Sequence, residues 1–241
     1  MRQRIRKGII LTSFVLLPVT LYYFSPYLII EGVSKGIITG SFIVFGVLFL
    51  SALFLGRIFC SWFCPLAGIQ EASFLAKNKS VNNKYNWIRY IIWVPWIVLI
   101  IYMAITAGGL KKVDFTYQTT YGVSVSDITV LPMYFTIVFL AIILSFAVGK
   151  RGFRHYVCWM SPFMIGGRKF RNLFKWPSLR LKSDKNKCID CKTCTKNCPM
   201  SLDVNGMVGS RSMENSECIL CGSCVDNCEK GVIKYLFSKG I

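Results

Sequence analysis

The residues best suited to chemistry are cysteines near the C-terminus, where the same spacing occurs twice. The first run is Cys188-x2-Cys191-x2-Cys194-x3-Cys198-Pro199, and the second is Cys218-x2-Cys221-x2-Cys224-x3-Cys228. Thiolates at this spacing hold [4Fe–4S] clusters, and the fourth cysteine of each run binds the cluster of the other run. The spacing therefore predicts one cluster on Cys188, Cys191, Cys194 and Cys228. It predicts a second cluster on Cys198, Cys218, Cys221 and Cys224.

A disulfide framework and a pair of zinc sites are the alternatives for these cysteines. Zinc motifs use two CxxC pairs and do not need the closing x3-Cys step, so the closing cysteines favour iron–sulfur clusters. Glu229 stands where the first run has Pro199. Because the proline binds no metal, this difference leaves the second ligand set intact. The chemistry that such clusters supply is electron transfer.

The segments that must position these cysteines are strongly apolar. The chain has 241 residues, of which 54% are hydrophobic, and its mean hydropathy is +0.49. A helix needs roughly 20 apolar residues to cross a bilayer core of about 30 Å. Four stretches without charge meet this length: 8–30, 36–56, 90–110 and 128–149. They predict an α-helical membrane domain of four transmembrane helices within residues 1–167. The first apolar run is too long for a secretory signal peptide and is expected to be a retained anchor.

The distribution of basic residues predicts how this domain is oriented. Of the 21 lysines and arginines before residue 184, all but Lys35, Lys111 and Lys112 fall on one side of the predicted spans. Positive charge stays on the cytoplasmic side, so both termini and the cysteine runs are expected in the cytoplasm, on a multi-pass protein of the inner membrane. The formal net charge of +18 is concentrated beside the membrane, where it attracts lipid headgroups. We therefore expect membrane lipid as a partner and no nucleic acid.

Two loops at the inner ends of spans two and four repeat one another. After Gly56 the chain reads RIFCSWFCP, and after Gly149 it reads KRGFRHYVCW. Each loop is followed by a short apolar segment, which predicts two similar helical hairpins with membrane-edge cysteine loops at 56–70 and 149–167. Weak internal symmetry of this kind is common where a membrane protein places a site between repeats.

Bringing the two loops together would gather soft ligands at one point. The candidates for this third site are Cys60, Cys64 and Cys158, with His155 as a possible fourth ligand. Cysteine and imidazole together suit iron, zinc or an iron–sulfur centre. The alternative is that these cysteines pack as small apolar residues. Arg154 stands where the first loop has its first cysteine, and it could stabilise an anionic cluster, a flavin phosphate or a lipid headgroup.

The segment between the membrane domain and the cysteine runs is basic and aromatic. Residues 168–187 predict a juxtamembrane linker that lies on lipid headgroups, although binding of an acidic soluble carrier is the alternative. Residues 188–241 predict a small α+β bacterial-type 2[4Fe–4S] ferredoxin domain. The linker would hold this domain close to the membrane-edge loops.

The first loop, GRIFCSWFCPLAGIQE at 56–71, resembles the CxxxCP element of the NapH/NosR-type membrane polyferredoxins. The resemblance covers nearly the whole chain, but Arg154 and Trp159 depart from the second loop of that family. It implies electron transfer between a quinol pool or a cytoplasmic donor and a redox partner, which would be a flavoprotein, a reductase or a cytochrome. A bound quinone is therefore a further possible cofactor.

Three functions remain open at this point. The first is a membrane electron-transfer subunit of the kind used in anaerobic respiration, an oxidoreductase component without substrate chemistry of its own. The others are an accessory reductase for the maturation of another enzyme and a redox-sensing membrane protein. No phosphate-binding loop or catalytic triad occurs in the sequence. The predicted spans also carry no carboxylate, which argues against an ion pump acting alone.

Overall fold

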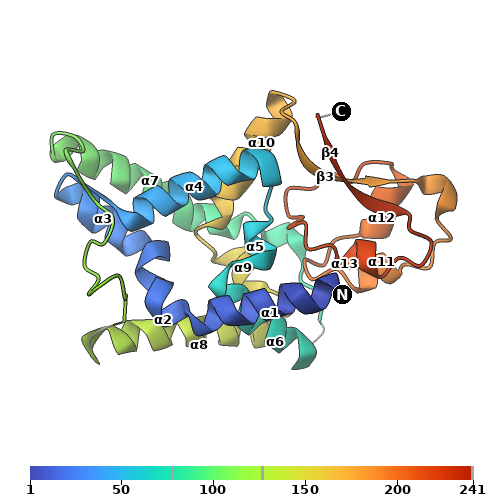
Figure 1. Ribbon diagram of the computed structural model, residues 1–241, viewed down its shortest axis with the longest axis horizontal. Coiled ribbons are helices and arrows are strands. Elements are labelled where there is room, and N and C mark those ends of the chain that lie inside the picture. The colour runs from blue at the N-terminus through green and yellow to red at the C-terminus, as the bar shows by residue number, and fades with distance from the viewer. Residues whose placement is uncertain (77–78, 126–127, 240–241) are drawn as a thin grey trace.

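A computed structural model describes residues 1–76, 79–125 and 128–239. A helical domain (residues 1–173) forms one end of an elongated molecule, and a smaller cysteine unit (residues 178–239) forms the other (Figure 1). The N-terminus of helix α1 (Arg2–Val15) lies beside the cysteine unit. The first residues of the chain are therefore close to the last sixty.

The predicted first span, residues 8–30, is not one helix. Helix α1 is followed by α2 (Leu17–Thr20), the 3₁₀ helix η1 (Leu21–Phe24) and α3 (Pro26–Ser34), and the chain bends by 60° where α1 ends. Pro18 and Pro26 cause these breaks, because proline lacks the N–H group that an interior helical position must donate. Both prolines stand in the first turn of a new helix.

The predicted second span, residues 36–56, is also shorter than expected. Gly36 has a φ of 69°, and strand β1 (Ile37–Thr39) pairs in parallel with β2 (Lys112–Asp114). Helix α4 (Gly40–Leu55) begins only after Thr39, whose hydroxyl accepts from the Phe42 N–H. Its 16 residues rise about 24 Å, less than a bilayer core of about 30 Å.

Two helices in the described part of the chain are long and apolar enough to cross a membrane, where the sequence predicts four. These are α7 (Ile88–Thr106) and α8 (Leu131–Val148, preceded by η3, Ile128–Val130), which match the third and fourth predicted spans. The bent segment from Arg2 to Phe24 would be a third if it is counted as one broken span. Only 6% of the α7 window and 11% of the α8 window are buried, so the apolar side chains of both helices lie mainly on the surface.

The two loops predicted to repeat one another have the same order of elements. Helix α4 ends at Gly56 and is followed by the short helix α5 (Phe59–Trp62) and by α6 (Pro65–Ala76). Helix α8 ends at Gly149 and is followed by the short helix α9 (Gly152–Tyr156) and by α10 (Ser161–Leu173). The packing is exchanged between the repeats, because α6 lies against α8 while α10 lies against α4. This exchange holds α5 and α9 together in the middle of the helical domain (Figure 1).

The cysteine unit is a small α+β fold whose sheet is a single antiparallel pair. Strand β3 (Ser178–Ser183) pairs with β4 (Ile233–Ser238). Between the strands lie the 3₁₀ helix η4 (Lys185–Lys187) and the short helices α11 (Thr193–Lys196), α12 (Val204–Gly209) and α13 (Ser223–Asp226). The segment 168–187, expected to be a linker, therefore holds the end of α10, strand β3 and η4. The cysteine unit begins about ten residues before the predicted start at Cys188.

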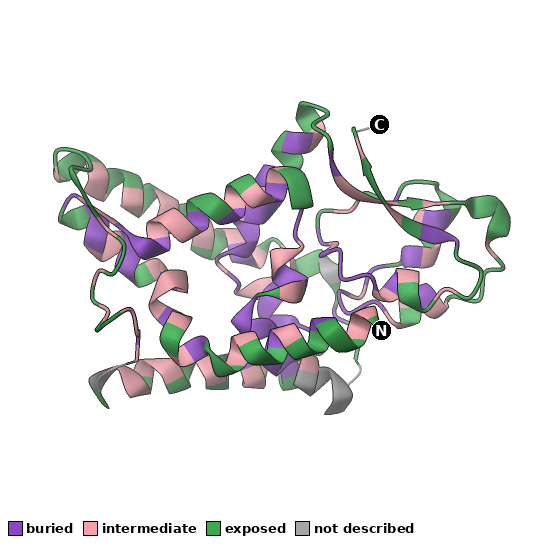
Figure 2. Ribbon diagram, in the orientation of Figure 1, coloured by how far each residue is buried: buried purple, intermediate pink, exposed green. Residues whose placement is uncertain are grey.

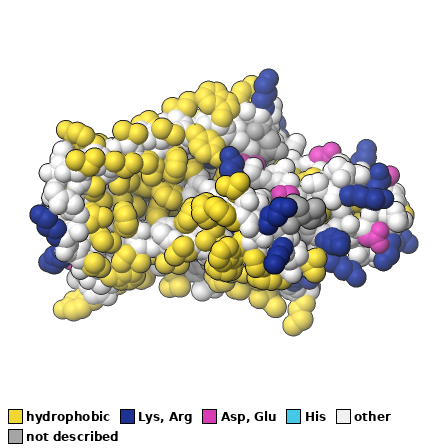
Figure 3. Space-filling view, turned by 90° about the horizontal axis from the view of Figure 1, so that it is seen from above, with side chains coloured by type: hydrophobic (Ala, Val, Ile, Leu, Met, Phe, Trp, Pro, Cys, Tyr) yellow, Lys and Arg dark blue, Asp and Glu magenta, His cyan; other side chains and the backbone are white. Residues whose placement is uncertain are grey.

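The buried residues and the apolar surface lie in different places. Burial is greatest where α5, α6, α9 and α10 meet the cysteine unit, whereas the outer helices are exposed along most of their length (Figure 2). Hydrophobic side chains cover much of the helical domain, and lysines and arginines gather on the cysteine unit (Figure 3).

The short 3₁₀ helix η2 (Asn83–Tyr85) joins the two repeats ahead of α7.

Candidate iron–sulfur sites

The outer cavity lies at the end of the cysteine unit that faces away from the helical domain. Its volume is about 160 Å³, and among the residues that line it are Cys188, Cys191, Cys194 and Cys228. Cys191 is exposed, whereas Cys194 is buried at the start of α11. Asp190 and Lys192 both adopt left-handed backbone conformations, with φ of 52° and 57°. This turn directs the successive cysteines of the first run toward one cavity.

The inner cavity lies between the first cavity and the helical domain. It is tighter, with a volume of about 20 Å³, and its lining includes Cys198, Cys218, Cys221 and Cys224. The turn of the first run is repeated here, since Leu220 and Gly222 have φ of 52° and 77°. A Cβ atom on Gly222 would lie only 2.7 Å from the Tyr235 hydroxyl. Glycine is therefore required at this position both by the backbone conformation and by the space.

The two linings place each predicted ligand set around its own cavity. Cys228 lies with the first run and Cys198 with the second, which is the exchange of fourth ligands predicted from the spacing. Among the described residues, no three Cys, His, Asp or Glu side chains converge closely enough to bind one metal ion. In a [4Fe–4S] cluster each iron has its own thiolate. Each cavity is lined by the four cysteines that one [4Fe–4S] cluster requires, so the residues present fit two clusters.

The loop that carries the second run is bonded to the helical domain through its backbone carbonyl groups. The donors are side chains from three segments, namely α1, the loop after Gly56 and α10: Gln3 Nε2 to Cys221 O (3.0 Å), Arg57 Nη1 to Ser216 O (2.8 Å), Ser61 Oγ to Ile219 O (2.7 Å) and Arg168 Nη1 to Cys218 O (2.7 Å). Buried carbonyl groups are costly when they have no donor. These four bonds therefore fix the inner cavity against the helical domain.

Three carboxylates, each shared by two or more arginines, hold the same region together. Glu217 pairs with Arg57 (3.1 Å) and with Arg89. Glu214 pairs with Arg168 (2.5 Å), Arg180 (3.3 Å) and Arg171 (3.6 Å). Glu71 pairs with Arg6 (2.5 Å) and Arg151 (2.6 Å). Burial alone would raise the pKa of Glu217, but the guanidinium groups of Arg57 and Arg89 outweigh it and lower the pKa to about 2. These carboxylates are therefore ionised at neutral pH.

Sequence reasoning missed these arginines, because it assigned them to lipid headgroups. Six of them are between 0% and 2% exposed: Arg6, Arg57, Arg89, Arg151, Arg168 and Arg171. A buried arginine needs an anionic partner, and the chain has only four acidic residues before residue 184. This shortage of acidic residues could have indicated that the arginines pair with carboxylates later in the chain. Glu214 and Glu217 lie just before the second cysteine run, and they supply part of the missing negative charge.

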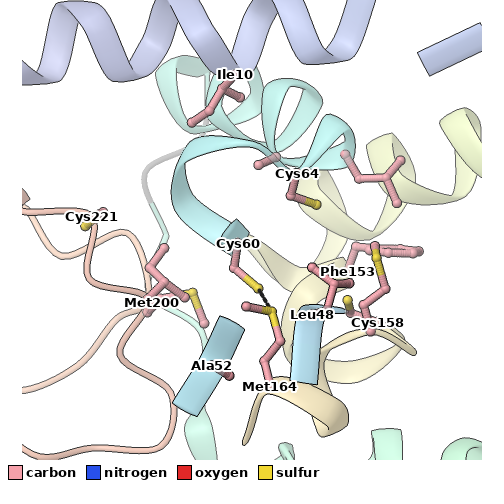
Figure 4. Packing of buried hydrophobic residues seen from close by; sticks show 14 of the residues in the cluster. Ile10, Leu48, Ala52, Cys60, Cys64, Phe153, Cys158, Met164, Met200 and Cys221 are labelled. Atoms are coloured by element: carbon pink, nitrogen blue, oxygen red, sulfur yellow. Dashed lines mark hydrogen bonds between the residues drawn. The ribbon is translucent and has the colours of Figure 1, made fainter. Parts of the chain in front are cut away.

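The third candidate site contains its three cysteines but not its histidine. Cys60 belongs to α5, Cys64 precedes α6 and Cys158 follows α9, and all three are buried (Figure 4). The Cys60 sulfur lies 3.3 Å from the Met164 sulfur of α10. Arg154 is 1% exposed, and its charge is felt by Cys64 and Cys158. Within the described residues no carboxylate forms an ion pair with Arg154. Its charge acts on all three cysteines, Cys60, Cys64 and Cys158.

His155 points to a different part of the structure from the three cysteines. Its Nδ1 lies 2.9 Å from Asn86 Oδ1, and its charged neighbours are Glu217, Arg57, Arg89 and Arg154. Burial lowers its pKa to about 3, so the ring is neutral at pH 7. Because Arg154 rather than His155 faces the cysteines, the prediction of a histidine ligand has no support in these contacts. Neighbouring residues on a helix point about 100° apart, so only one of the two can face the cysteines.

Met200 connects the third candidate site to the inner cavity. It is fully buried and lines the inner cavity. Figure 4 shows it on the side of Cys60 that faces Cys221. The sulfur-containing side chains of Met200, Cys60 and Met164 therefore lie in one buried cluster between the cysteine unit and the helical domain.

A large apolar cavity lies on the other face of α10. Its volume is about 510 Å³, and its walls come from α4, α7 and α10, including Phe45, Trp96 and Phe163. Phe163 packs edge-to-face on the rings of Phe45, Trp93 and Trp96. Trp93 also lines this cavity, and its Nε1 is buried without a hydrogen-bond partner. Among the described residues that line it, the cavity thus offers an apolar volume with one unused donor, the Trp93 N–H group.

Two segments of the chain match families of iron–sulfur domains. Residues 37–82, which include Cys60 and Cys64, match a family described as a 4Fe-4S binding domain. Residues 162–241, which include all eight cysteines of the two runs, match a 4Fe-4S dicluster domain. The chain therefore contains two iron–sulfur binding domains, and the second begins within α10, ahead of the predicted start at Cys188.

Similar proteins occur in an archaeon and a bacterium. Two uncharacterized proteins of Methanocaldococcus jannaschii, MJ0750 and MJ0749, are 29% and 25% identical to this chain over 171 and 191 residues. These matches cover 66% and 74% of this chain, and 65% and 68% of the relatives. YccM of Escherichia coli, provisionally named an electron transport protein, is 22% identical over 78% of this chain and 54% of its own length. No solved structure matches the chain. These findings support an iron–sulfur protein of electron transport.

Proposed function

We propose that this chain is a membrane-bound electron-transfer subunit of the NapH/NosR type. It would relay single electrons between a soluble carrier or enzyme at the outer cavity and a redox partner in or across the membrane. The observation that carries the proposal is the division of eight cysteines between one exposed cavity and one that is fixed against the helical domain. Bound clusters would supply one-electron chemistry. The chain itself positions the thiolates, excludes water from the inner site and neutralises its charge.

The exposed apolar surface supports placement in a membrane. Helices α7 and α8 expose Ile91, Val98, Ile105, Phe139 and Ile143, among other large side chains. A soluble protein rarely exposes so large a contiguous apolar surface. We place the cysteine unit on the cytoplasmic side, where thiolate-bound clusters are protected from oxidation. A C-terminal fusion reporter should be active only in the cytoplasm, and activity outside would overturn this orientation.

Anaerobic purification tests the main proposal. Two cubanes correspond to about eight irons and eight sulfides per chain, and a protein without cubane absorption or electron paramagnetic resonance signals would refute the function. A maturation reductase and a redox sensor use the same clusters, so kinetics must separate them. Sustained reduction of a quinone analogue by the reduced protein would favour the relay over a purely sensory role.

We further propose that Cys60, Cys64 and Cys158 hold a third iron–sulfur centre. Arg154 carries this proposal, because a buried guanidinium without a carboxylate needs another anion, and thiolate-bound clusters are anionic. The wild-type protein should then contain more than eight irons, and Cys60→Ser and Cys158→Ser should reduce the count to about eight. His155→Gln, the matched control from the same loop, should leave the count unchanged.

The apolar cavity between α4, α7 and α10 is the place where we propose that a quinone binds. Its lining suits an isoprenoid chain, and the unpaired Trp93 N–H can donate to a quinone carbonyl group. Gly166 lines this cavity, and Arg168, two residues later on α10, donates to Cys218 O. These residues are about 3 Å apart along the helix axis, so α10 lines the apolar cavity and is also bonded to the loop that carries the inner cysteines.

Binding of a water-soluble quinone analogue tests this site. Trp93→Phe keeps the aromatic ring but removes the donor, so it should weaken binding threefold to tenfold, the usual value of one hydrogen bond. Trp87→Phe changes an exposed tryptophan at the start of α7 and should have no effect. Failure of the wild-type protein to bind the analogue would place the electron acceptor elsewhere, without affecting the two clusters.

A further inference from the structure

The inner and outer cavities lie in different electrostatic surroundings. Around the inner cavity, the three shared carboxylates described above face seven arginines, which leaves an excess of four positive charges. Lys150 is a further buried cation close to the inner cavity. It is 6% exposed, its ammonium group donates to Lys196 O at 3.2 Å, and its charge is felt by Cys198.

Several of these cations lie directly against the ligand loop of the inner cavity. Arg168 donates to the carbonyl oxygen of Cys218 at 2.7 Å. Arg6 and Arg151 act electrostatically on Cys221. The Nε and Nη1 atoms of Arg151 are buried without an acceptor among the described residues, so only part of its hydrogen-bonding capacity is used by Glu71. Because these groups are buried, salt screens them weakly.

Around the outer cavity the nearest charges are partly negative and mostly exposed. The Cys188 sulfur lies 3.8 Å from Asp190 Oδ1, and Glu229 lines the cavity and acts on Cys191. Lys230 also lines it, and Lys187 and Lys192 adjoin Cys188 and Cys191 in the chain, but all three lysines are exposed and screened by solvent. A cluster in this cavity would therefore gain an electron without help from a buried positive charge.

Reduction adds one negative charge to a cluster, and two opposing effects decide how readily it occurs. Burial disfavours the more highly charged reduced form, whereas nearby cations stabilise it. A buried unit charge roughly 10 Å away, at an effective dielectric of about 20, changes such an equilibrium by about tenfold. Several excess charges of this kind would outweigh the difference in burial between Cys191 and its counterparts at the inner cavity.

We propose that the arginines of the helical domain make the inner cluster the more easily reduced of the two. Electrons then enter from a soluble low-potential carrier at the outer cavity and collect at the inner one. In this step one electron leaves the reduced outer site and enters the oxidised inner site, and no proton moves and no bond is made or broken. This inference rests on the proposed function, and it adds a direction of electron flow.

Redox titration of the full-length protein, followed by electron paramagnetic resonance, tests the inference. In the wild-type protein the inner couple should have the higher potential. Arg168→Gln should make reduction of the inner cluster about tenfold less favourable. For a one-electron couple this lowers the inner potential by about 59 mV. Arg168→Lys keeps the charge and should stay close to wild type. Glu229→Gln should raise only the outer potential, which identifies the outer signal.

Two further variants keep the test decisive. Lys150→Gln should also lower the inner potential, and it removes a charge without breaking an arginine–carboxylate pair, so it serves if Arg168→Gln fails to fold. Lys35→Gln removes a charge from an exposed pair with Glu31 at the other end of the helical domain and should shift neither potential. A lower inner potential in the wild type, equal shifts in both Arg168 variants, or no shift in Arg168→Gln and Lys150→Gln would overturn the inference. Loss of both cluster signals in the wild type would instead refute the proposed function.

Discussion

Glu71 holds three helical segments together, and its removal gives the sharpest test of the buried ion pairs. It lies on α6 and accepts from Arg6 of α1 (2.5 Å) and from Arg151 at the start of α9 (2.6 Å). The side chains of Arg6 and Arg151 are only 3% and 1% exposed. Glu71→Gln keeps the shape of the side chain but leaves both guanidinium groups without a counter-ion.

The expected cost follows from the pKa of Glu71. Burial raises this pKa, but Arg151 and Arg6 outweigh it and lower the pKa from 4.5 to about 2. A depression of this size corresponds to about 3 kcal/mol of folding free energy at pH 7. This agrees with the 3–5 kcal/mol typical of breaking a buried ion pair. Glu71→Gln should therefore lower the free energy of unfolding of the detergent-solubilised protein by about 3 kcal/mol.

The dependence on pH separates this electrostatic effect from a packing defect. Because the folded-state pKa is depressed, the contribution of Glu71 is complete above the unfolded pKa of about 4.5 and is lost as the pH falls toward 2. The gap between wild type and Glu71→Gln should thus shrink by about 1 kcal/mol between pH 7 and pH 4. Glu31→Gln, which breaks the pair with the exposed Lys35, should cost less than about 1 kcal/mol at pH 7. A Glu71 gap below about 1 kcal/mol, or one that does not change with pH, would refute the reasoning.

Three further predictions follow from named contacts. Cys191→Ser and Cys221→Ser should each remove about four irons from a different cluster, so the two variants should lose different paramagnetic signals. Gly167→Ala should lower the free energy of unfolding by about 1–3 kcal/mol, because the added Cβ would lie 2.6 Å from Phe49 O. The added Cβ of the control Gly166→Ala would meet nothing closer than 3.7 Å, so this variant should be neutral or stabilising. Ser61→Ala should cost 1–3 kcal/mol by leaving the buried Ile219 carbonyl without its donor, whereas Ser51→Ala, whose hydroxyl bonds only within its own helix, should cost less than about 1 kcal/mol.

The parts of the structure that could be predicted from the sequence depend on short-range patterns. The cysteines of each run lie within 11 residues of one another, so their spacing alone restricts which cavity each can reach. Helices α7 and α8 were predicted because each largely coincides with a charge-free stretch of membrane length, residues 90–110 and 128–149. The repeat of a glycine, a short helix and a second helix was visible because both copies preserve the order of residue types around Cys64 and Cys158.

The first two predicted spans show where composition misleads. Hydropathy records the absence of charge in residues 8–30, but Pro18 and Pro26 break the helix there. In residues 36–56 the positive φ of Gly36 and the pairing of β1 with β2 take up the first residues of the apolar run. Apolar character alone therefore does not determine where a helix begins, breaks or ends.

The ion pairs could not be predicted because their partners are distant in the sequence. Arg57 meets Glu217 across 160 residues and Arg151 meets Glu71 across 80. A rule based on lipid charge explains the same arginines equally well from the sequence, and only the exchanged packing of the two repeats decides between the explanations. Likewise, the sequence does not show whether Arg154 or His155 faces the three cysteines of the third site. In the structure α9 directs only Arg154 toward them.

The buried arginines connect folding with electron transfer. Each must be compensated, and the described carboxylates compensate only part of their charge. An anionic cluster in the inner cavity would supply much of the rest, so the interface should be most stable when that cluster is present and reduced. Without the cluster, the excess of positive charge at the interface would be uncompensated and costly. The docking of the cysteine unit onto the helical domain should therefore weaken when the inner cluster is lost, while loss of the outer cluster should leave it unchanged. Limited proteolysis of Cys221→Ser and Cys191→Ser would measure that difference. Equal protection of the two variants would show that docking of the cysteine unit does not depend on the charge of the inner cluster.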